Sequence, residues 1–175
     1  MMNGDDDVLL VKEFKKGQDK AFDIIFNKYR LSVYSICYRY IRNDEDAREL
    51  TQDVFIKVYR NLNKFNEKSK LFTWLYRIVV NTCLSFKRKN KGYANPSELS
   101  PSSAISMEER LVMKKAIDDA LQDLPERQRM VFILRHYDGY KFDEIAELMG
   151  ITNGAAKANH YHAVIKLRGL LKEWL

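Results

Sequence analysis

The sequence predicts an all-α protein in which two small helical domains are joined by a flexible linker. Apolar residues recur at intervals of three and four over most of the chain, which is the period of an amphipathic helix. β-Hairpin signals are missing, and the seven glycines and three prolines lie mostly where the helical patterns end. Residues 93–106, YANPSELSPSSAIS, hold two of the prolines and no helical period. They predict the linker, between a domain at residues 1–92 and another at 107–175.

Composition favours a folded cytoplasmic protein with an anionic partner. The chain has 175 residues, of which 46% are hydrophobic and 31% charged, and its net charge is +6. The N-terminus is acidic where a signal peptide is basic, and no long apolar run follows, so we expect neither secretion nor membrane insertion. Cys37 and Cys83 lack metal-ligand spacing. We expect buried, reduced thiols, with a disulfide as the weaker alternative.

The first two helices are expected at residues 8–16 and 21–40. Three aspartates at positions 5–7 precede the first helix, where the helix dipole favours negative charge, and Gly17 ends it. The apolar positions of the second helix form one continuous face over five turns, which predicts a long core helix.

A third helix is expected over residues 45–61, with Asn43 or Asp44 as its N-cap. One side is an apolar stripe. The other faces are mainly acidic and carry Asp46, Glu49, Gln52 and Asp53. Such a face is either solvated and balanced by Arg48 and Lys57, or a docking surface for a basic partner, and the pattern alone favours the solvated face.

The most basic stretch of the chain is residues 68–93, with seven Lys/Arg and no Asp or Glu. It follows a polar loop at 61–70 and predicts a fourth helix, which Thr73 or Ser69 caps and Gly92 stops.

Three aromatic residues near the start of this basic helix, Phe72, Trp74 and Tyr76, are expected to be exposed. Positive charge beside exposed rings suits single-stranded nucleic acid, because unstacked bases lie on aromatic faces. The alternative is a surface helix whose aromatics pack inward and whose lysines are solvated.

The second domain ends in a helix-turn-helix pattern. After an amphipathic stretch that ends at Leu124, Pro125 opens a helix over 126–137. A short helix at 142–149 follows, and then a turn containing Gly150. Thr152 can cap the longer helix that comes next and runs to about Trp174.

The longer helix has no acid between residues 153 and 172, and such a helix enters the major groove by its N-terminal residues. Asn159 is a candidate for bidentate pairing with adenine, whereas Lys157 and Lys166 suit phosphates. The full set of candidate duplex contacts is Thr152, Asn153, Ala155, Ala156, Lys157, Asn159, His160 and Lys166.

No catalytic, metal or cofactor site is expected. His160 and His162 are two residues apart and point to different sides of a helix, and His136 and Cys37 cannot be tied to them by spacing. We interpret the histidines as structural or phosphate-contacting. Motifs for nucleotide binding or nucleophilic catalysis are missing from the sequence, so an enzyme acting on nucleic acid is disfavoured.

Three blocks of the sequence resemble bacterial RNA polymerase sigma factors of the extracytoplasmic-function (ECF) class. They are DARELTQDVFIKVYR at 46–60, LFTWLYRIVVN at 71–81, and LPERQRMVFILRHYDGYKFDEIAELMGIT at 124–152 with the helix that follows. The resemblance covers nearly the whole chain. It implies a sigma factor that binds core RNA polymerase, melts promoter DNA and directs transcription initiation, and a probable anti-sigma partner. The alternative is a stand-alone helix-turn-helix regulator.

The resemblance also implies a role for each surface. The acidic helix would dock on the clamp of the largest polymerase subunit and the C-terminal helix would read the minus-thirty-five duplex. The residues that would act at the minus-ten element are Lys70, Thr73, Trp74, Arg77 and Asn81, with Lys87 and Arg88 on phosphates.

Four residues depart from the pattern of this class. Ala158 and Asn159 stand where many members have Ser and Arg, so we expect a different upstream promoter sequence. Lys141 replaces a helix-capping Ser or Thr, and Ser85 replaces a frequent Asp.

Overall fold

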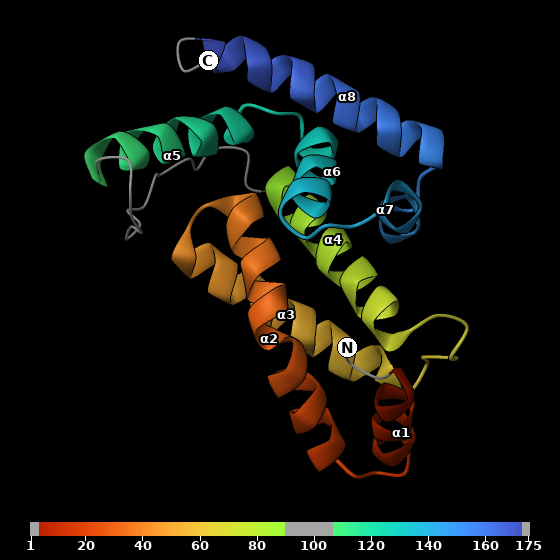
Figure 1. The fold of residues 1–175 in the computed structure, drawn as a ribbon. Helices are drawn as coiled ribbons and strands as arrows, with labels where there is room; N and C mark the ends of the chain where they lie inside the picture. The colour runs from red at the N-terminus through yellow and green to blue at the C-terminus, as the bar shows by residue number, and fades with distance from the viewer. Residues whose placement is uncertain (1–3, 90–106, 173–175) are drawn as a thin grey trace. The chain divides into compact units, whose positions relative to one another are not determined.

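The computed structural model describes residues 4–89 and 107–172 and divides the chain into two compact units, residues 1–91 and 92–175. The described residues form eight α-helices and no strand, which confirms the expected all-α class (Figure 1). The expected linker at 93–106, Gly92 and Trp174 lie outside the described residues.

Unit 1 contains α1 (Gly4–Lys15), α2 (Lys20–Ile41), α3 (Asp44–Leu62) and α4 (Leu71–Lys89). Helices α2, α3 and α4 pack against one another, and α1 covers one end of them (Figure 1). The apolar face of α2 is buried as the periodicity predicts, and the stripe expected for α3 is buried too, at Ala47, Leu50, Val54 and Val58.

The first helix starts earlier than expected. Helix α1 begins at Gly4, so the aspartates at 5–7 lie inside it rather than before it. Asp7 is only 6% exposed and accepts hydrogen bonds from the Tyr29 hydroxyl, at 2.6 Å, and from Lys28. Burial, followed by this hydrogen bond, raises the pKa of Tyr29. The partners on α2 allow an aspartate to be buried within α1.

Unit 2 contains α5 (Met107–Gln122), α6 (Glu126–His136), α7 (Phe142–Met149) and α8 (Asn153–Leu170). Helix α8 packs on each of the other three. Its buried residues Ala163 and Leu167 join Ala120, Leu121 and Leu124 in one apolar cluster. The last helix ends at Leu170, about one turn earlier than the sequence pattern suggests.

Candidate functional site

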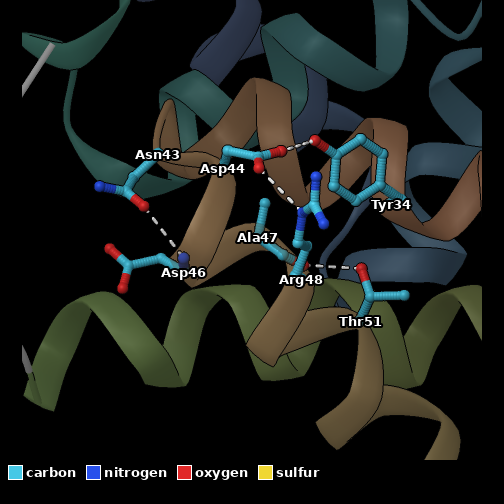
Figure 2. A network of polar contacts seen from close by, with 7 residues as sticks. All are labelled: Tyr34, Asn43, Asp44, Asp46, Ala47, Arg48 and Thr51. Carbon is cyan, nitrogen blue, oxygen red and sulfur yellow. Dashed lines mark hydrogen bonds and ion pairs between the residues drawn. The ribbon is translucent and has the colours of Figure 1, made fainter. Parts of the chain in front are cut away.

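The start of α3 is fixed by a polar network (Figure 2). The Asn43 side-chain oxygen accepts from the backbone N–H of Asp46 at 3.0 Å, so Asn43 is the N-cap. Asp44 instead accepts from the Tyr34 hydroxyl and from Arg48, the latter at 2.8 Å. The hydrogen bond to Asp44 and partial burial raise the pKa of Tyr34. Helix α3 is thereby held to α2 at the end where its acidic face begins.

The acidic face of α3 points to solvent. Glu49, Gln52 and Asp53 are exposed and Asp46 is half-buried. The two cations that would balance this face are engaged elsewhere: Arg48 pairs with Asp44, and the Lys57 ammonium donates to the Thr82 hydroxyl on α4 at 3.0 Å. This arrangement favours a docking surface over a locally neutralised one.

Helix α4 presents the expected single-strand contacts along one face. Thr73 and Trp74 lie four and three residues before Arg77, and Asn81 lies four residues after it, so these residues share one side of the helix. Lys70 lies just before the helix, three residues before Thr73. Lys70, Arg77 and Asn81 are exposed, and Thr73 and Trp74 are half-buried. The helix begins at Leu71, which places Thr73 in its first turn rather than at its cap.

Lys87 and Arg88 fall in the last turns of α4. Their side chains lie outside the described part of the chain.

The expectation of exposed aromatic rings is wrong for Tyr76. Tyr76 is 3% exposed, and its ring centroid lies 4.1 Å from that of Phe72, which is half-buried. These two residues are four apart, so they occupy the same side of α4, and the buried Leu75 and Val79 flank that side. Of the three rings, Trp74 alone lies on the face of Lys70 and Arg77. Its indole packs on Phe65 there, with the two ring centroids 5.4 Å apart.

The loop before α4 is held in a defined conformation by hydrogen bonds. Phe65 is 2% exposed, and its carbonyl accepts from the Lys15 ammonium of α1 at 2.6 Å. The Asn66 side chain accepts from the backbone N–H of Lys68 at 3.3 Å, and Glu67 adopts a left-handed φ of 61°. Sequence reasoning treated this segment as a plain polar loop, because its anchor on α1 is 50 residues away.

The connection between α7 and α8 has the expected turn chemistry. Gly150 adopts a left-handed φ of 63° at the C-cap of α7. The Thr152 hydroxyl accepts from the backbone N–H of Ala155 at 3.1 Å, which confirms Thr152 as the cap of α8. At the start of α7, the Glu144 carboxylate accepts from the backbone N–H of Lys141 at 2.7 Å. That contact is the half of a capping box that the N3 residue supplies, and a lysine side chain has no acceptor for the other half.

The duplex-contact candidates on α8 differ in their exposure to solvent. Thr152 and Lys157 are exposed, Ala155 and His160 are half-buried, and Ala156 is 0% exposed because it packs in the core of unit 2.

Three other candidates already have partners. Asn153 donates to Asp143 on α7. Asn159 donates to the carbonyl of Ala155 in its own helix at 2.8 Å, and Lys166 donates to the carbonyl of Asp123 at 2.7 Å. Pairing of Asn159 with a base or of Lys166 with a phosphate would therefore require these bonds to exchange.

The structure brings together two pairs of residues that are far apart in the sequence. The Nε2 atoms of His136 and His160 lie 2.8 Å apart. The sulfur atoms of Cys37 and Cys83, both buried, lie 3.9 Å apart as free thiols. The two histidines are 24 residues apart, beyond any local spacing rule, so the sequence did not predict their contact. The buried free thiols confirm the state expected for the two cysteines.

The described residues contain no group of three or more His, Cys, Asp or Glu that could hold a metal ion. None of the helices in those same ranges is long and apolar enough to cross a bilayer.

Comparison with known proteins gives two family matches along the chain. The model of sigma-70 region 2 matches residues 25–93, which include most of α2 and all of α3 and α4. The model of sigma-70 region 4 matches residues 114–167, which span most of unit 2.

Curated relatives and solved structures agree with these matches. The chain is 31% identical to the ECF RNA polymerase sigma-E factor of Escherichia coli (strain K12), over 90% of each chain. It is 29% identical to the ECF RNA polymerase sigma factor SigW of Bacillus subtilis (strain 168), over 93% of this chain and 95% of the relative. The fold is similar to that of CnrH in complex with the cytosolic domain of CnrY, with a TM-score of 0.73 and 20% identity over 96% and 98% of the two chains.

The acidic α3, the basic α4 and the helix-turn-helix of unit 2 thus lie within matched sigma-70 regions, and both relatives align with 90% or more of the chain. The chain belongs to the ECF class of RNA polymerase sigma factors, and it is an alternative sigma factor that directs transcription initiation.

Proposed function

We propose that three surfaces of this chain divide the work of initiation. In this proposal residues 1–92 bind core polymerase and melt the minus-ten element, residues 107–175 bind the minus-thirty-five duplex, and residues 93–106 connect them. The observation that carries the proposal is the segregation of charge in unit 1. Glu49 and Asp53 are exposed on α3, whereas Lys70, just before α4, and Arg77 on α4 are exposed on the other surface.

The proposed polymerase-docking residues are Asp46, Glu49, Gln52 and Asp53. Their support is the fixed start of α3 and the engagement of Arg48 and Lys57 elsewhere, which leaves the negative charge of this face available to a basic partner.

The proposed minus-ten surface combines α4 with the loop before it. Lys70 and Arg77 would hold phosphates, while Trp74 and Asn81 would contact an extruded base. Extrusion of a base costs a few kcal/mol. Because the Lys15 contact already holds the loop in shape, less conformational entropy would be lost when the DNA binds.

The proposed minus-thirty-five surface is the N-terminal half of α8. Exposed Thr152 and Lys157 suit phosphates, since a helix N-terminus favours anions. Ala155, Asn159 and His160 would reach base edges, since the N-terminal residues of a recognition helix enter the major groove.

We further propose an anti-sigma partner and a purely non-enzymatic role in the cytoplasm. Sigma factors are generally DNA-binding regulators rather than enzymes. A solved structure of similar fold is the sigma factor RpoE in complex with the anti-sigma factor NepR from Bartonella quintana, with a TM-score of 0.69 and 23% identity over 87% of this chain and 98% of that one. This likeness of fold makes a protein partner of that kind the natural candidate.

Titration with core polymerase tests the docking surface. The Asp53→Lys variant should bind core polymerase about tenfold more weakly than the wild type, the equivalent of ~1.4 kcal/mol. Asp23→Lys, with the same charge change at an exposed site on α2, is the matched control and should bind normally.

Run-off transcription tests the DNA surfaces. Polymerase charged with the wild-type chain should start at specific promoters, and Trp74→Ala should reduce open-complex formation while core binding persists. Equal core binding by Asp53→Lys and wild type would refute the docking surface, and normal promoter opening by Trp74→Ala would refute the minus-ten surface.

A further inference from the structure

Two histidines meet head to head between α6 and α8. His136 is the last residue of α6, and His160 lies in the N-terminal half of α8. Their Nε2 atoms are 2.8 Å apart, their ring centroids 5.0 Å apart, and their planes differ by 14°. The centroid separation exceeds the nitrogen separation by about one ring radius on each side, so the two nitrogens point at each other in nearly coplanar rings.

This geometry allows one kind of hydrogen bond. One imidazole must donate its Nε2–H, and the other must accept with its Nε2 lone pair. A neutral pair or a pair with one extra proton satisfies this condition. Two imidazolium rings do not, because two N–H groups would then face each other. The nitrogens also point at each other rather than at a common third point, which disfavours a shared metal ion.

The surroundings favour the neutral pair. The Phe132 ring stacks on His136 at 4.2 Å, and the Phe142 ring meets His160 edge-on at 5.3 Å. Arg135, held by a hydrogen bond to the Tyr140 carbonyl, lies over Phe142. Partial burial, and then the charge of Arg135, lower the pKa of His136. Burial, His136 and Arg135 lower the pKa of His160.

The other charged groups on the elements around the pair have their own places. On α7, Asp143 accepts from Asn153, and Glu144 accepts from the backbone of Lys141. On α8, Lys157 is exposed three residues before His160. Lys157 thus adds a positive charge near the pair. The carboxylates of Asp143 and Glu144 are occupied by hydrogen bonds of their own.

We propose that His136 is a positioning residue for DNA reading: its hydrogen bond fixes the His160 ring on α8 and is lost when the pair takes up a second proton. This inference rests on the proposed minus-thirty-five role of α8. The hydrogen bond leaves Nδ1 of His160 as the ring nitrogen available to DNA. The hydrogen bond also decides whether Nδ1 of His160 is a donor or an acceptor. If His160 donates its Nε2–H to His136, its Nδ1 is an acceptor, and if it accepts at Nε2, its Nδ1 carries the proton.

The pH dependence has a definite sign. In the unfolded chain both histidines titrate near a pKa of about 6.5, whereas in the fold both pKa values are lowered. Below about pH 6.5 the unfolded chain therefore binds more protons than the folded chain, and stability falls as pH falls through that window. Above it, the stability that comes from the neutral pair is fully present.

Nuclear magnetic resonance titration of the histidine rings in the full chain tests the pair without DNA. His136 and His160 should titrate as a coupled pair, and His136→Ala should raise the pKa of His160. His162→Gln is the matched control, since His162 is exposed on the same helix and its ring contacts Tyr161 instead. Independent titration, or an unmoved His160 in His136→Ala, would overturn the pair.

Binding to a minus-thirty-five duplex recovered from run-off promoters tests the positioning role. At about pH 7.5, where both rings are neutral, His136→Ala should bind roughly threefold to tenfold more weakly, the scale of one net hydrogen bond. His136→Gln should restore affinity, because its amide can donate to a neutral His160, but it should lack the wild-type pH dependence.

The two failures are distinguishable. If the wild type ignores the duplex while the rings titrate as a pair, the DNA role of α8 is refuted and the pair stands. If the wild type binds and His136→Ala binds equally well across pH, the positioning role is refuted.

Discussion

At the scale of single residues, Arg129 shows how unit 2 is held together. It is a 2% exposed cation whose guanidinium donates to the carbonyls of Leu121 and Leu124, at 2.7 and 3.0 Å, and to the carbonyl and side chain of Gln122. These acceptors lie at the C-terminus of α5 and just beyond it, where backbone carbonyls lack helical partners and the dipole favours positive charge. One side chain thus joins the end of α5 to α6.

Replacing Arg129 with methionine should destabilise unit 2 by about 2–4 kcal/mol, because several buried carbonyls lose a charged donor. Amide hydrogen exchange of the full chain is the measurement: protection in α5, α6 and α8 should fall, while protection in α2 stays as it is. Arg127→Met, exposed on the same helix, is the control. Unchanged exchange in α5 would contradict the assigned role.

Side-chain roles of this kind were the least accessible to sequence reasoning. Thr152 could be identified as a cap because its hydroxyl and the Ala155 N–H that donates to it lie three residues apart. Asp7 was treated as a helix-dipole residue, although Lys28 and Tyr29 bind it from α2. A local rule works where both partners lie within one turn of each other and fails where the fold supplies the second partner.

At the scale of elements, caps and turns predicted some helix boundaries well, whereas α1 begins earlier and α8 ends earlier than expected. The short helix expected at 142–149 coincides with α7, because Gly150 provides the left-handed residue that ends it. The faces of the helices were harder to predict. The basic stretch suggested three exposed rings, but Tyr76 is buried. The rings were expected to be exposed because the stretch is strongly basic. The four-residue spacing of Phe72 and Tyr76 instead places both on the side of the buried stripe.

Asn43→Ala should cost unit 1 about 1 kcal/mol, since the N–H of Asp46 loses its acceptor. Denaturant unfolding of the full chain, followed by circular dichroism, measures this loss. Asn27→Ala, exposed on α2, serves as its control. The same Asn43 variant should weaken core polymerase binding less than Asp53→Lys, because it loosens α3 without removing its charge. An Asn43 variant as stable as the wild type would exclude the cap.

At the scale of the whole molecule, the positive charge is unevenly divided. Residues 1–91 contain 19 Lys/Arg and 12 Asp/Glu, a net charge of +7, while residues 92–175 contain 11 and 12, a net charge of −1. The two ranges together give the +6 of the chain. In the proposed function, unit 2 would therefore attract DNA through the local charge of α8, which carries Lys157, Lys166 and Arg168 and no acid.

Lys157→Ala should reduce the salt dependence of duplex binding. The slope of log affinity against log salt should become shallower by about 0.9, the value for one lost phosphate contact. Fluorescence anisotropy with a minus-thirty-five duplex at several salt concentrations gives the slope. Lys115→Ala on α5, also exposed, should leave it unchanged. Equal slopes for the wild type and Lys157→Ala would place this lysine away from the phosphates.

The neighbouring thiols of α2 and α4 give unit 1 a built-in chemical reporter. Cys37 and Cys83 are each 0% exposed, so a bulky maleimide reaches them only while these helices are apart. The alkylation rate in native buffer therefore counts opening events of the domain proposed to melt DNA. An adduct on either sulfur would be too large for that interior, and each recorded event would leave a molecule unable to close.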